Sequence, residues 1–517
     1  MLAKDSDKKT EWRIKMIQII CKSESYTYNA YHILKAFYPS QEVSCKTDEE
    51  ASNYVTVQLP DGQEIFAETE NLQTEKKRQT DLNLYDQLEK ITGEPLAWGV
   101  LTGVRPTKLA MQKLEAGWKK EDYIRWAWES ARVRKEKAVL AWEIAERERK
   151  ILEELDYEEG YSLYVGIPFC PSVCSYCSFS SGPLDRWKEK VDVYVDTLCK
   201  ELEFIAERSK NKKLNTIYIG GGTPTTLTAE QLERLMGWID EKFSREHLLE
   251  YTVEAGRPDS ITEEKLKVIK SHGITRISIN PQSMQQKTLD AIGRKHTVEE
   301  IKEAYALARE TGFDNINMDI IAGLPGEDIS DMEDTLAQIA QMKPDSLTVH
   351  SLAIKRAARM EMRDLHRDVK ETHDILSGMI EKAAKTAEEM ELFPYYLYRQ
   401  KNIAGNFENV GYAKVDKAGI YNILIMEEKH LASGSDATEK LYYHDSHGRE
   451  FTATVLSCEE KVTAKGKKEG YRVVLDRTLF FPEGGGQFGD QGWIDGIKVT
   501  DTHEKNGVIY HETEAPI

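Results

Sequence analysis

Short apolar runs alternate with longer amphipathic stretches along the chain from about residue 160 to residue 395. The short runs are rich in β-branched and aromatic residues, as strands are, and the longer stretches repeat their apolar residues at helical spacing. The pattern predicts six strands, at 162–167, 216–220, 251–255, 275–280, 316–323 and 346–352. Helical stretches between consecutive strands indicate an α/β fold with parallel strands. Periodicity leaves open whether the strands form a doubly wound sheet or a complete or partial βα-barrel.

The stretch from Trp187 to Arg208 shows the helical spacing clearly. Its apolar side chains fall on one face, so we expect that face to pack against the sheet. The residues on this face are Val191, Tyr194, Val195, Leu198, Leu202 and Ile205.

The regions on either side of the repeat have different patterns. Residues 1–158 predict a mixed α+β extension, with a hairpin whose turn is Pro60-Asp61-Gly62. A charged helical stretch follows from about Glu121 to Leu155, and its charge density indicates a solvated face. Residues 431–517 are rich in glycine and in short strand-like runs, which is typical of a small all-β module. We therefore expect three domains, at 1–158, 159–430 and 431–517.

Charge and composition narrow the class of protein. The 517 residues include 70 Lys and Arg against 88 Asp and Glu, a net charge of −18. This balance argues against a protein that binds nucleic acid or anionic membranes through bulk positive charge. No apolar run approaches the roughly 18 residues that span a bilayer, and residues 1–15 lack the apolar core of a secretory signal. We expect a cytoplasmic protein without membrane contact, whose seven cysteines are reduced thiols or metal ligands.

Three of the cysteines stand close together directly after the first predicted strand, in the run IPFCPSVCSYCSFSS. Cys170, Cys174 and Cys177 can bind three irons of a cubane [4Fe–4S] cluster and leave the fourth iron open to a small-molecule ligand. A closed zinc site is the alternative, but it needs four protein ligands. Cys199 lies on the following predicted helix, and no histidine stands nearby. The spacing therefore favours the cluster.

A C-x3-C-x2-C pattern after the first strand of a βα repeat resembles the radical S-adenosylmethionine (radical SAM) superfamily. Further motifs narrow the resemblance to the oxygen-independent coproporphyrinogen III oxidase family and, over roughly residues 1–429, to its HemZ-type coproporphyrinogen dehydrogenase branch. These motifs are Tyr164 to Cys170, Gly220 to Pro224, Glu254, Arg276 to Gln282, Gly293-Arg294, Asp319 to Pro325, Tyr396 to Asn402 and Glu408 to Tyr412. The resemblance implies a partial (β/α)6 TIM-type radical SAM barrel.

The resemblance also implies the cofactors and their binding residues. The three cysteines would hold the cluster, and its open iron would bind S-adenosylmethionine. Gly220, Gly221, Gly222 and Thr223 would run beneath the methionine part, and Glu254 would meet the cationic side of the cofactor. Gln282, Arg294 and Asp319 would position its carboxylate and ribose hydroxyls. Tyr164 would act beside the cluster, with an ordinary core position as the alternative.

The implied reaction is oxidative decarboxylation of porphyrinogen propionates to vinyl groups in haem biosynthesis. The substrate would be coproporphyrinogen III, and a flavodoxin or ferredoxin would supply electrons. Four propionates need cations, and the candidates after the sixth strand are Lys355, Arg356, Arg359, Arg399 and Lys401, each of which surface charge explains equally well. The better-known oxidase branch has a histidine where this chain has Gly166, so a proton-transfer role for that histidine does not carry over. A haem chaperone related to the same family is therefore an alternative.

The C-terminal module, at about 437–517, resembles the opening β-barrel of the alanyl-tRNA editing (AlaX-like) family. The motifs are Val474 to Thr478, Phe481 to Gln487 and Asp490 to Gly492. The resemblance implies that Thr478 and Gln487 face the mischarged amino acid. Hydrolysis in that family needs zinc held by a downstream HxxxH motif, which this sequence does not carry, and we expect His444 and His447 to be surface residues. We predict no deacylase activity and no tRNA contact, which disfavours a third alternative, an aminoacyl-tRNA editing factor.

Overall fold

The computed structural model describes residues 16–39, 41–67, 76–101, 105–157, 160–179, 181–353, 358–360, 369–399, 407–427, 429, 439–440, 450–462, 468–475, 477–482, 490–505 and 508–517. Its largest sheet has eight strands in the order β13-β14-β12-β11-β10-β9-β8-β5. These strands are β5 (Gly160–Ile167), β8 (Lys213–Gly221), β9 (Glu250–Glu254), β10 (Arg276–Ser278), β11 (Ile316–Ala322), β12 (Ser346–Ser351), β13 (Phe393–Arg399) and β14 (Glu408–Ala413). All six predicted strands are confirmed.

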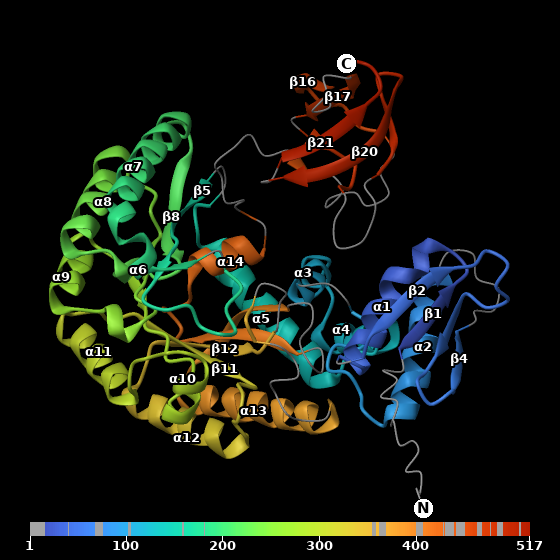
Figure 1. Ribbon diagram of the computed structural model, residues 1–517, viewed down its shortest axis with the longest axis horizontal. Helices are drawn as coiled ribbons and strands as arrows, with labels where there is room; N and C mark the ends of the chain where they lie inside the picture. The colour runs from blue at the N-terminus through green and yellow to red at the C-terminus, as the bar shows by residue number, and fades with distance from the viewer. Residues whose placement is uncertain are drawn as a thin grey trace, which may run out of the picture.

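The order of the parallel strands decides between the two predicted architectures. Each strand from β5 to β12 in this sheet pairs in parallel with the one that follows it. A doubly wound sheet would reverse direction at a switch point, whereas crossovers that all run one way place the helices on one face. Figure 1 shows the helices along the outer arc, with the strands inside. The fold is therefore a partial βα-barrel, as the family resemblance implied.

The barrel helices follow the strands in sequence. They are α7 (Val191–Arg208), α8 (Ala229–Lys242), α9 (Glu263–Ser271), α10 (Gln286–Ala291), α11 (Val298–Glu310), α12 (Ile329–Met342) and α13 (Val369–Glu389). The predicted apolar face of α7 packs into the main hydrophobic cluster. Beyond β12, β14 and β13 extend the sheet in antiparallel fashion, and α14 (Ile420–Met426) follows.

The two faces of this sheet differ in chemistry. On the outer face, apolar side chains such as Ile219, Val253 and Ile277 are fully buried in the hydrophobic cluster beneath the helices. On the inner face, the alternate residues are polar, and they line a cavity. Those of β9 to β12 are Thr252, Glu254, Arg276, Ser278, Asn317, Asp319, Thr348 and His350. Alternation along a strand sends successive side chains to opposite faces, so the barrel interior is a polar chamber rather than a packed apolar core.

The N-terminal region forms a smaller sheet in the order β2-β1-β3-β4. Its elements are β1 (Ile17–Cys21), α1 (Glu24–Phe37), β2 (Val43–Thr47), β3 (Val55–Gln58), β4 (Glu64–Ala67) and α2 (Lys76–Thr92). β3 and β4 form the predicted hairpin, and Gly62 turns between them with φ +91°, a conformation that glycine adopts freely.

The charged stretch after residue 105 forms separate helices. They are α3 (Pro106–Glu115), α4 (Lys120–Ala131) and α5 (Lys135–Glu153). The left-handed conformation of Arg132, with φ 56°, ends α4 and divides the helix that the sequence predicted as one. These helices are not solvated on all sides, because Tyr123, Trp142 and Ile144 are buried in the hydrophobic cluster of the barrel and Glu148 is fully buried. A domain boundary near 158 stays a proposal, and hydrophobic contacts run across it.

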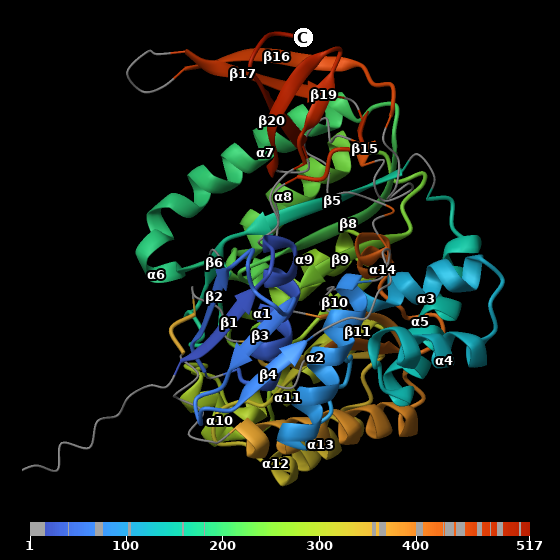
Figure 2. The same cartoon turned by 90° about the vertical axis from the view of Figure 1, so that its right-hand side faces the viewer.

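The C-terminal region is all-β, as predicted. Its five-stranded antiparallel sheet has the order β16-β17-β21-β20-β19. Its strands are β16 (Val455–Val462), β17 (Lys468–Leu475), β19 (Gly492–Ile494), β20 (Ile497–Lys505) and β21 (Val508–Thr513), and Figure 2 shows this sheet at the top. Two short strands, β15 (Glu439–Lys440) and β18 (Arg477–Thr478), pair separately. Thr478 is fully buried, and its hydroxyl lies 2.9 Å from His511 Nε2. Gln487, His444 and His447 lie outside the described residues.

None of the described helices is both long enough and apolar enough to cross a membrane.

Candidate active site

The polar chamber of the barrel holds a cavity of about 360 Å³. It lies at the carboxyl ends of the strands, where the loops of a βα-barrel gather functional groups. Most residues predicted to bind cofactor line it: Cys170, Cys174, Cys177, Gly221, Gly222, Thr223, Glu254, Gln282, Arg294 and Asp319. Gly220 and Tyr164 are not among the lining residues, although both lie next to Tyr218, which is.

The three cysteines form one wall of this cavity. They lie on the cysteine loop, residues 170–181, between β6 (Phe169–Cys170) and β7 (Gly182–Pro183). The Thr223 hydroxyl donates to Cys170 Sγ at 3.5 Å, and the backbone N–H of Cys177 donates to the carbonyl oxygen of Cys174 at 3.2 Å. Burial raises the pKa of the Cys177 thiol above its usual value. All three are free cysteines, so three thiols converge on one cavity.

Arg257 fixes the cysteine loop and was missed in the sequence. Its guanidinium donates to the carbonyl oxygen of Ser172 at 3.1 Å and to Cys174 Sγ at 3.7 Å. The guanidinium also donates two hydrogen bonds, of 3.0 and 2.7 Å, to the carboxylate of Asp259. The Arg257 side chain is only 4% exposed. Arg257 therefore holds the cysteine loop at both a backbone carbonyl and a cysteine sulfur.

The glycine run after β8 lies in close contact with the cysteine loop. A Cβ on Gly222 would lie 2.7 Å from the Phe169 carbonyl oxygen and 3.0 Å from Cys170 Sγ. A Cβ on Gly221, whose φ is +108°, would lie 3.0 Å from the backbone nitrogen of Ile167. Side chains at these positions would push the loop and its thiol away, so the run gives close approach of two backbones.

Gly222→Ala is therefore expected to destabilise the protein by about 1–3 kcal/mol, the usual cost of overpacking, and to lower the iron content after reconstitution. Gly237 is the matched control, because it lies within α8 and an added Cβ there meets nothing within 4 Å. Gly237→Ala should leave both properties unchanged or stabilise the helix slightly. Thermal melts and iron analysis measure the two effects, and equal behaviour of the two variants would contradict the packing argument.

Glu254 ends β9 and receives a hydrogen bond of 2.6 Å from the Tyr218 hydroxyl. Burial raises the pKa of Glu254 to about 7, although this hydrogen bond opposes the rise. Tyr164 stacks on Tyr218 with ring centroids 5.9 Å apart, is 44% exposed, and has a pKa that burial raises to about 12. Tyr421 of α14 covers the other part of the Tyr218 ring at 4.4 Å. Tyr164 therefore contacts Tyr218, whose hydroxyl donates to Glu254 in the cavity, and does not itself line the cavity.

Asp319 is the second carboxyl group of the cavity, and its pKa shifts in the opposite direction. Burial alone would raise the pKa of Asp319, but His350 and the amide of Asn317 lower it below its usual value. Asn317 Nδ2 donates to Asp319 Oδ1 at 2.6 Å, and His350 Nε2 lies 3.8 Å from Asp319 Oδ2. Near neutral pH, Asp319 is therefore ionised while Glu254 can gain or lose a proton, a separation typical of sites that handle polar ligands.

Gln282 has a strained backbone at the same cavity. Its φ is +67°, a region that non-glycine residues rarely occupy. Backbone hydrogen bonds of 2.9 Å to Asp319 and Ile321 hold it there. Its side-chain oxygen and that of Asn280 are buried without a partner among the described residues, yet both side chains line the cavity. Buried polar atoms normally have partners, so the chamber suits a ligand with several hydrogen-bond donors, such as an amino acid or a ribose.

Of the predicted substrate cations, the two that the structure describes, Arg359 and Arg399, do not line the cavity. Lys355, Arg356 and Lys401 lie outside the described residues. Arg359 is exposed, and it lines a separate groove. Arg399 is buried, donates to the Leu101 carbonyl oxygen at 2.7 Å, and has a pKa that burial lowers to about 10.

The cations that line the cavity come from the strands and loops of the barrel instead. They are Arg257, Arg276 and Arg294, and the imidazole of His350 lines the cavity as well. Arg276 is only 3% exposed and donates to the carbonyl oxygen of Lys417 at 2.9 Å. The sequence of residues 275–280, TRISIN, contains a signal for Arg276. Side chains alternate between the two faces of a strand, so Arg276 shares a face with the polar residues Ser278 and Asn280.

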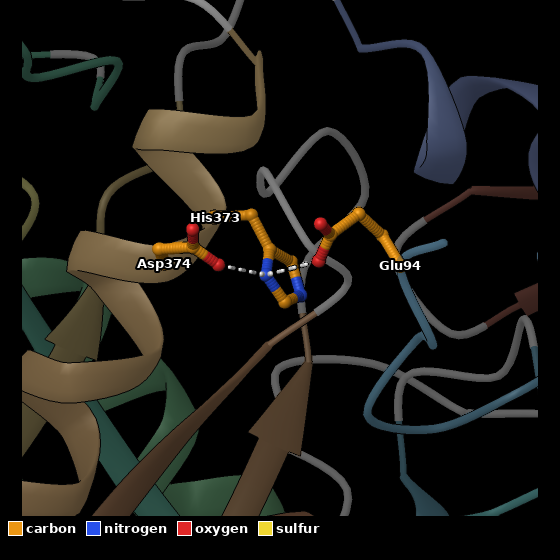
Figure 3. Close-up of side chains that lie close together, drawn as sticks. All are labelled: Glu94, His373 and Asp374. Atoms are coloured by element: carbon orange, nitrogen blue, oxygen red, sulfur yellow. Dashed lines mark ion pairs between the residues drawn. The ribbon is translucent and has the colours of Figure 1, made fainter. Parts of the chain in front are cut away.

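A further cluster of polar side chains consists of Glu94, His373 and Asp374 (Figure 3). His373 Nδ1 of α13 lies 3.7 Å from Glu94 Oε2 and 3.7 Å from Asp374 Oδ1. Glu94 follows α2, so the cluster connects the N-terminal region with the barrel. It adds nothing to the chamber, because none of the three residues lines it.

Comparison with known proteins identifies the family. The model of the radical SAM superfamily matches residues 164–339, which span the cysteine loop and most of the barrel. The oxygen-independent coproporphyrinogen-III oxidase-like protein HemZ of Bacillus subtilis is 43% identical over 365 residues, covering 69% of this chain and 73% of HemZ. The chain belongs to the HemZ family of radical SAM proteins. Its cofactors are accordingly a [4Fe–4S] cluster and S-adenosylmethionine, and the three thiols and unpartnered amides fit them.

Other similar proteins cover less of the chain. The heme chaperone HemW of Bacillus subtilis is 35% identical over 195 residues, which is 38% of this chain and 51% of HemW. The structure of coproporphyrinogen III oxidase, HemN, from Escherichia coli is 26% identical with a TM-score of 0.41, over 47% of this chain and 56% of HemN. The model of class II (A) tRNA synthetases matches residues 404–516, the region that contains the C-terminal sheet.

Proposed function

We propose that this HemZ-family protein converts propionate groups of coproporphyrinogen III to vinyl groups by oxidative decarboxylation. The observation that carries the proposal is the polar chamber, in which three thiols and two carboxyl groups of opposite pKa shift line one cavity. When bound, the cluster and S-adenosylmethionine would supply the radical chemistry, and an electron acceptor would take up the electron that remains when carbon dioxide leaves. The chain itself binds, orients and shields the reactants.

Each lining group has a role that its environment supports. Cys170, Cys174 and Cys177 would hold the cluster, with Arg257 keeping their loop in place. Asp319 stays ionised, so it would accept hydrogen bonds from two ribose hydroxyls. Glu254 would receive the cationic amino group and give up its proton when that group binds.

The chamber also supports radical chemistry on a tetrapyrrole acid. Radical intermediates need a site that excludes water and oxygen, and the cavity lies inside the barrel beneath Tyr218 and the cysteine loop. Arg276 and His350 lie on the inner strand face and would pair with propionates. A flavodoxin or ferredoxin would supply the electron that cleavage requires.

The direct test is anaerobic reconstitution with iron and sulfide, followed by incubation with S-adenosylmethionine, dithionite and coproporphyrinogen III. We expect 5′-deoxyadenosine together with mono- and divinyl products, measured by liquid chromatography and mass spectrometry. Omission of S-adenosylmethionine is the control and should abolish both products. If 5′-deoxyadenosine forms without any vinyl product, the substrate assignment is wrong, although the radical chemistry stands.

A haem chaperone is the second candidate, favoured by Gly166. An added Cβ there would meet only Tyr164 Cε1, at 3.5 Å, so packing does not require glycine at this position. This chain lacks the side chain that the better-known oxidase branch has there, and the relative HemW is named a heme chaperone. Stoichiometric haem binding in a titration, without vinyl product in the assay above, would favour the chaperone.

A further inference from the structure

A second hollow, which we call the outer groove, lies on the other side of the cysteine loop and has a volume of about 920 Å³. It runs between that loop and α6 (Leu184–Trp187) with the first turns of α7. Figure 2 shows α6 beside β6 at the start of α7. Val173, Cys177, Phe179 and Ser181 line both the outer groove and the inner cavity. The cysteine loop is thus a thin wall between the two.

The outer groove is positively charged on a negatively charged protein. Arg186, Lys190 and Arg359 line it, and none of the described residues that line it is acidic. No ion pair joins any of these three cations to another described residue. The whole chain carries a net charge of −18, so an acidic partner would be repelled by most of the surface and attracted here.

Exposed apolar side chains also line the outer groove. Phe179, Trp187 and Val193 line it and are 73%, 49% and 60% exposed, respectively. Large apolar side chains gathered in one exposed place are typical of a contact surface for another molecule. Aromatic residues and arginine together are the residue types enriched in protein interfaces.

We infer that the outer groove is the docking surface for an acidic electron-carrier protein that reduces the cluster. This inference rests on the proposed function, which requires a one-electron donor. The carrier, a reduced flavin or iron–sulfur protein, loses one electron and the cluster gains it. No bond forms or breaks in this step, and no proton moves. Electron transfer slows steeply with distance, and the groove reaches Cys177 itself.

The position of the wall favours a carrier over the tetrapyrrole substrate. A molecule that reacts with the radical must lie on the side of S-adenosylmethionine, which is the side of Glu254, Gln282 and Asp319. None of these three residues lines the outer groove. A carrier in the groove therefore meets the cluster from behind and leaves the reaction chamber free.

The test uses the reconstituted full chain and a purified acidic flavodoxin. The variant Arg186→Glu with Lys190→Glu reverses two charges of the groove. Lys150→Glu with Lys210→Glu is the matched control, since it makes the same charge change at exposed lysines that do not line the groove. We expect the groove variant to weaken flavodoxin binding by about tenfold or more at low salt, and the control to retain wild-type binding. Calorimetry at two salt concentrations measures this without any turnover.

Turnover measured with each reductant distinguishes an error in the docking-surface inference from an error in the proposed function. Flavodoxin-driven formation of 5′-deoxyadenosine should fall in the groove variant, while dithionite-driven formation stays at the wild-type rate. Unchanged flavodoxin binding in the groove variant would overturn the inference, whatever the activity. Loss of coproporphyrinogen or haem binding, with flavodoxin binding intact, would also overturn it and show that the groove holds a tetrapyrrole. If neither reductant gives vinyl product, the proposed function fails while the binding result still stands.

Discussion

Replacing Cys174 with alanine is expected to remove the visible absorbance of the reconstituted cluster and, with it, all cleavage of S-adenosylmethionine. Cys174 is 8% exposed and central in the cysteine loop, and its sulfur receives a hydrogen bond from the buried Arg257. Its loss leaves two thiols, which cannot hold a cubane cluster that has one iron open. Iron analysis and the absorbance spectrum after anaerobic reconstitution measure the effect.

Cys199 supplies the matched control for this experiment. It is 6% exposed on α7, so it is as buried as Cys174, but it does not line the cavity. Cys199→Ala should keep the full spectrum of the wild-type protein. An intact cluster in Cys174→Ala would refute the ligand assignment. Zinc with tetrahedral coordination in oxygen-free preparations of the wild-type protein would instead support the closed metal site.

The barrel strands were predictable because each carries its own signal. Runs such as TIYIG and SLTVHSL are short, β-branched and bounded by polar turns, so local sequence suffices to place them. Their order in the sheet is a different matter. It depends on which strands pair across the whole chain, and no local pattern encodes that choice between a barrel and a doubly wound sheet. Only the resemblance of the cysteine motif pointed to the barrel.

β13 and β14 were missed as strands, although their residues were recognised as a motif. β14 pairs antiparallel with both β12 and β13, which departs from the parallel pairing of the other strands in the sheet. Similarly, the charged stretch from Glu121 reads as one helix because its charges continue across the break. The break arises from the left-handed backbone conformation of Arg132, and arginine, unlike glycine, does not indicate such a conformation in the sequence.

The candidate site was predictable at the residues that carry motifs and not elsewhere. Cysteine and glycine spacing marked the cysteine loop, whereas Arg257, Arg276 and His350 reach the cavity through the alternation of strands and the folding of one loop. Arg399 shows the opposite error. An arginine after a strand looked suited to carboxylates, but its guanidinium is buried against Leu101 and Trp98, because nothing in the local sequence specifies which face of the antiparallel strand points inward.

The affinity for S-adenosylmethionine is expected to depend on the ionisation of Glu254. Its pKa of about 7 lies above the ordinary value of 4.5 because of burial. A cationic amino group favours the carboxylate, so affinity should fall by up to about tenfold for each pH unit below 7 and level off above it. The stability of the ligand-free protein depends on pH in the opposite direction. Because the folded state favours protonated Glu254, the contribution of Glu254 to the free energy of unfolding is full below its ordinary pKa of 4.5 and is lost as the pH rises through 7.

Glu254→Gln should remove this pH dependence and weaken binding by about ten- to a hundredfold at pH 8, since a hydrogen bond to a charged group contributes about 1.5–3 kcal/mol. Tyr218→Phe is the companion variant, because the Tyr218 hydroxyl donates to Glu254 and opposes the rise of its pKa. Its loss should move the midpoint of the binding curve to higher pH while keeping the dependence. Calorimetric titration of the reconstituted protein with S-adenosylmethionine between pH 5.5 and 8.5, a range of roughly three pH units around the pKa, follows both variants. An unchanged pH profile in Glu254→Gln would show that another group of the chamber, and not this carboxyl, meets the cationic side of the cofactor.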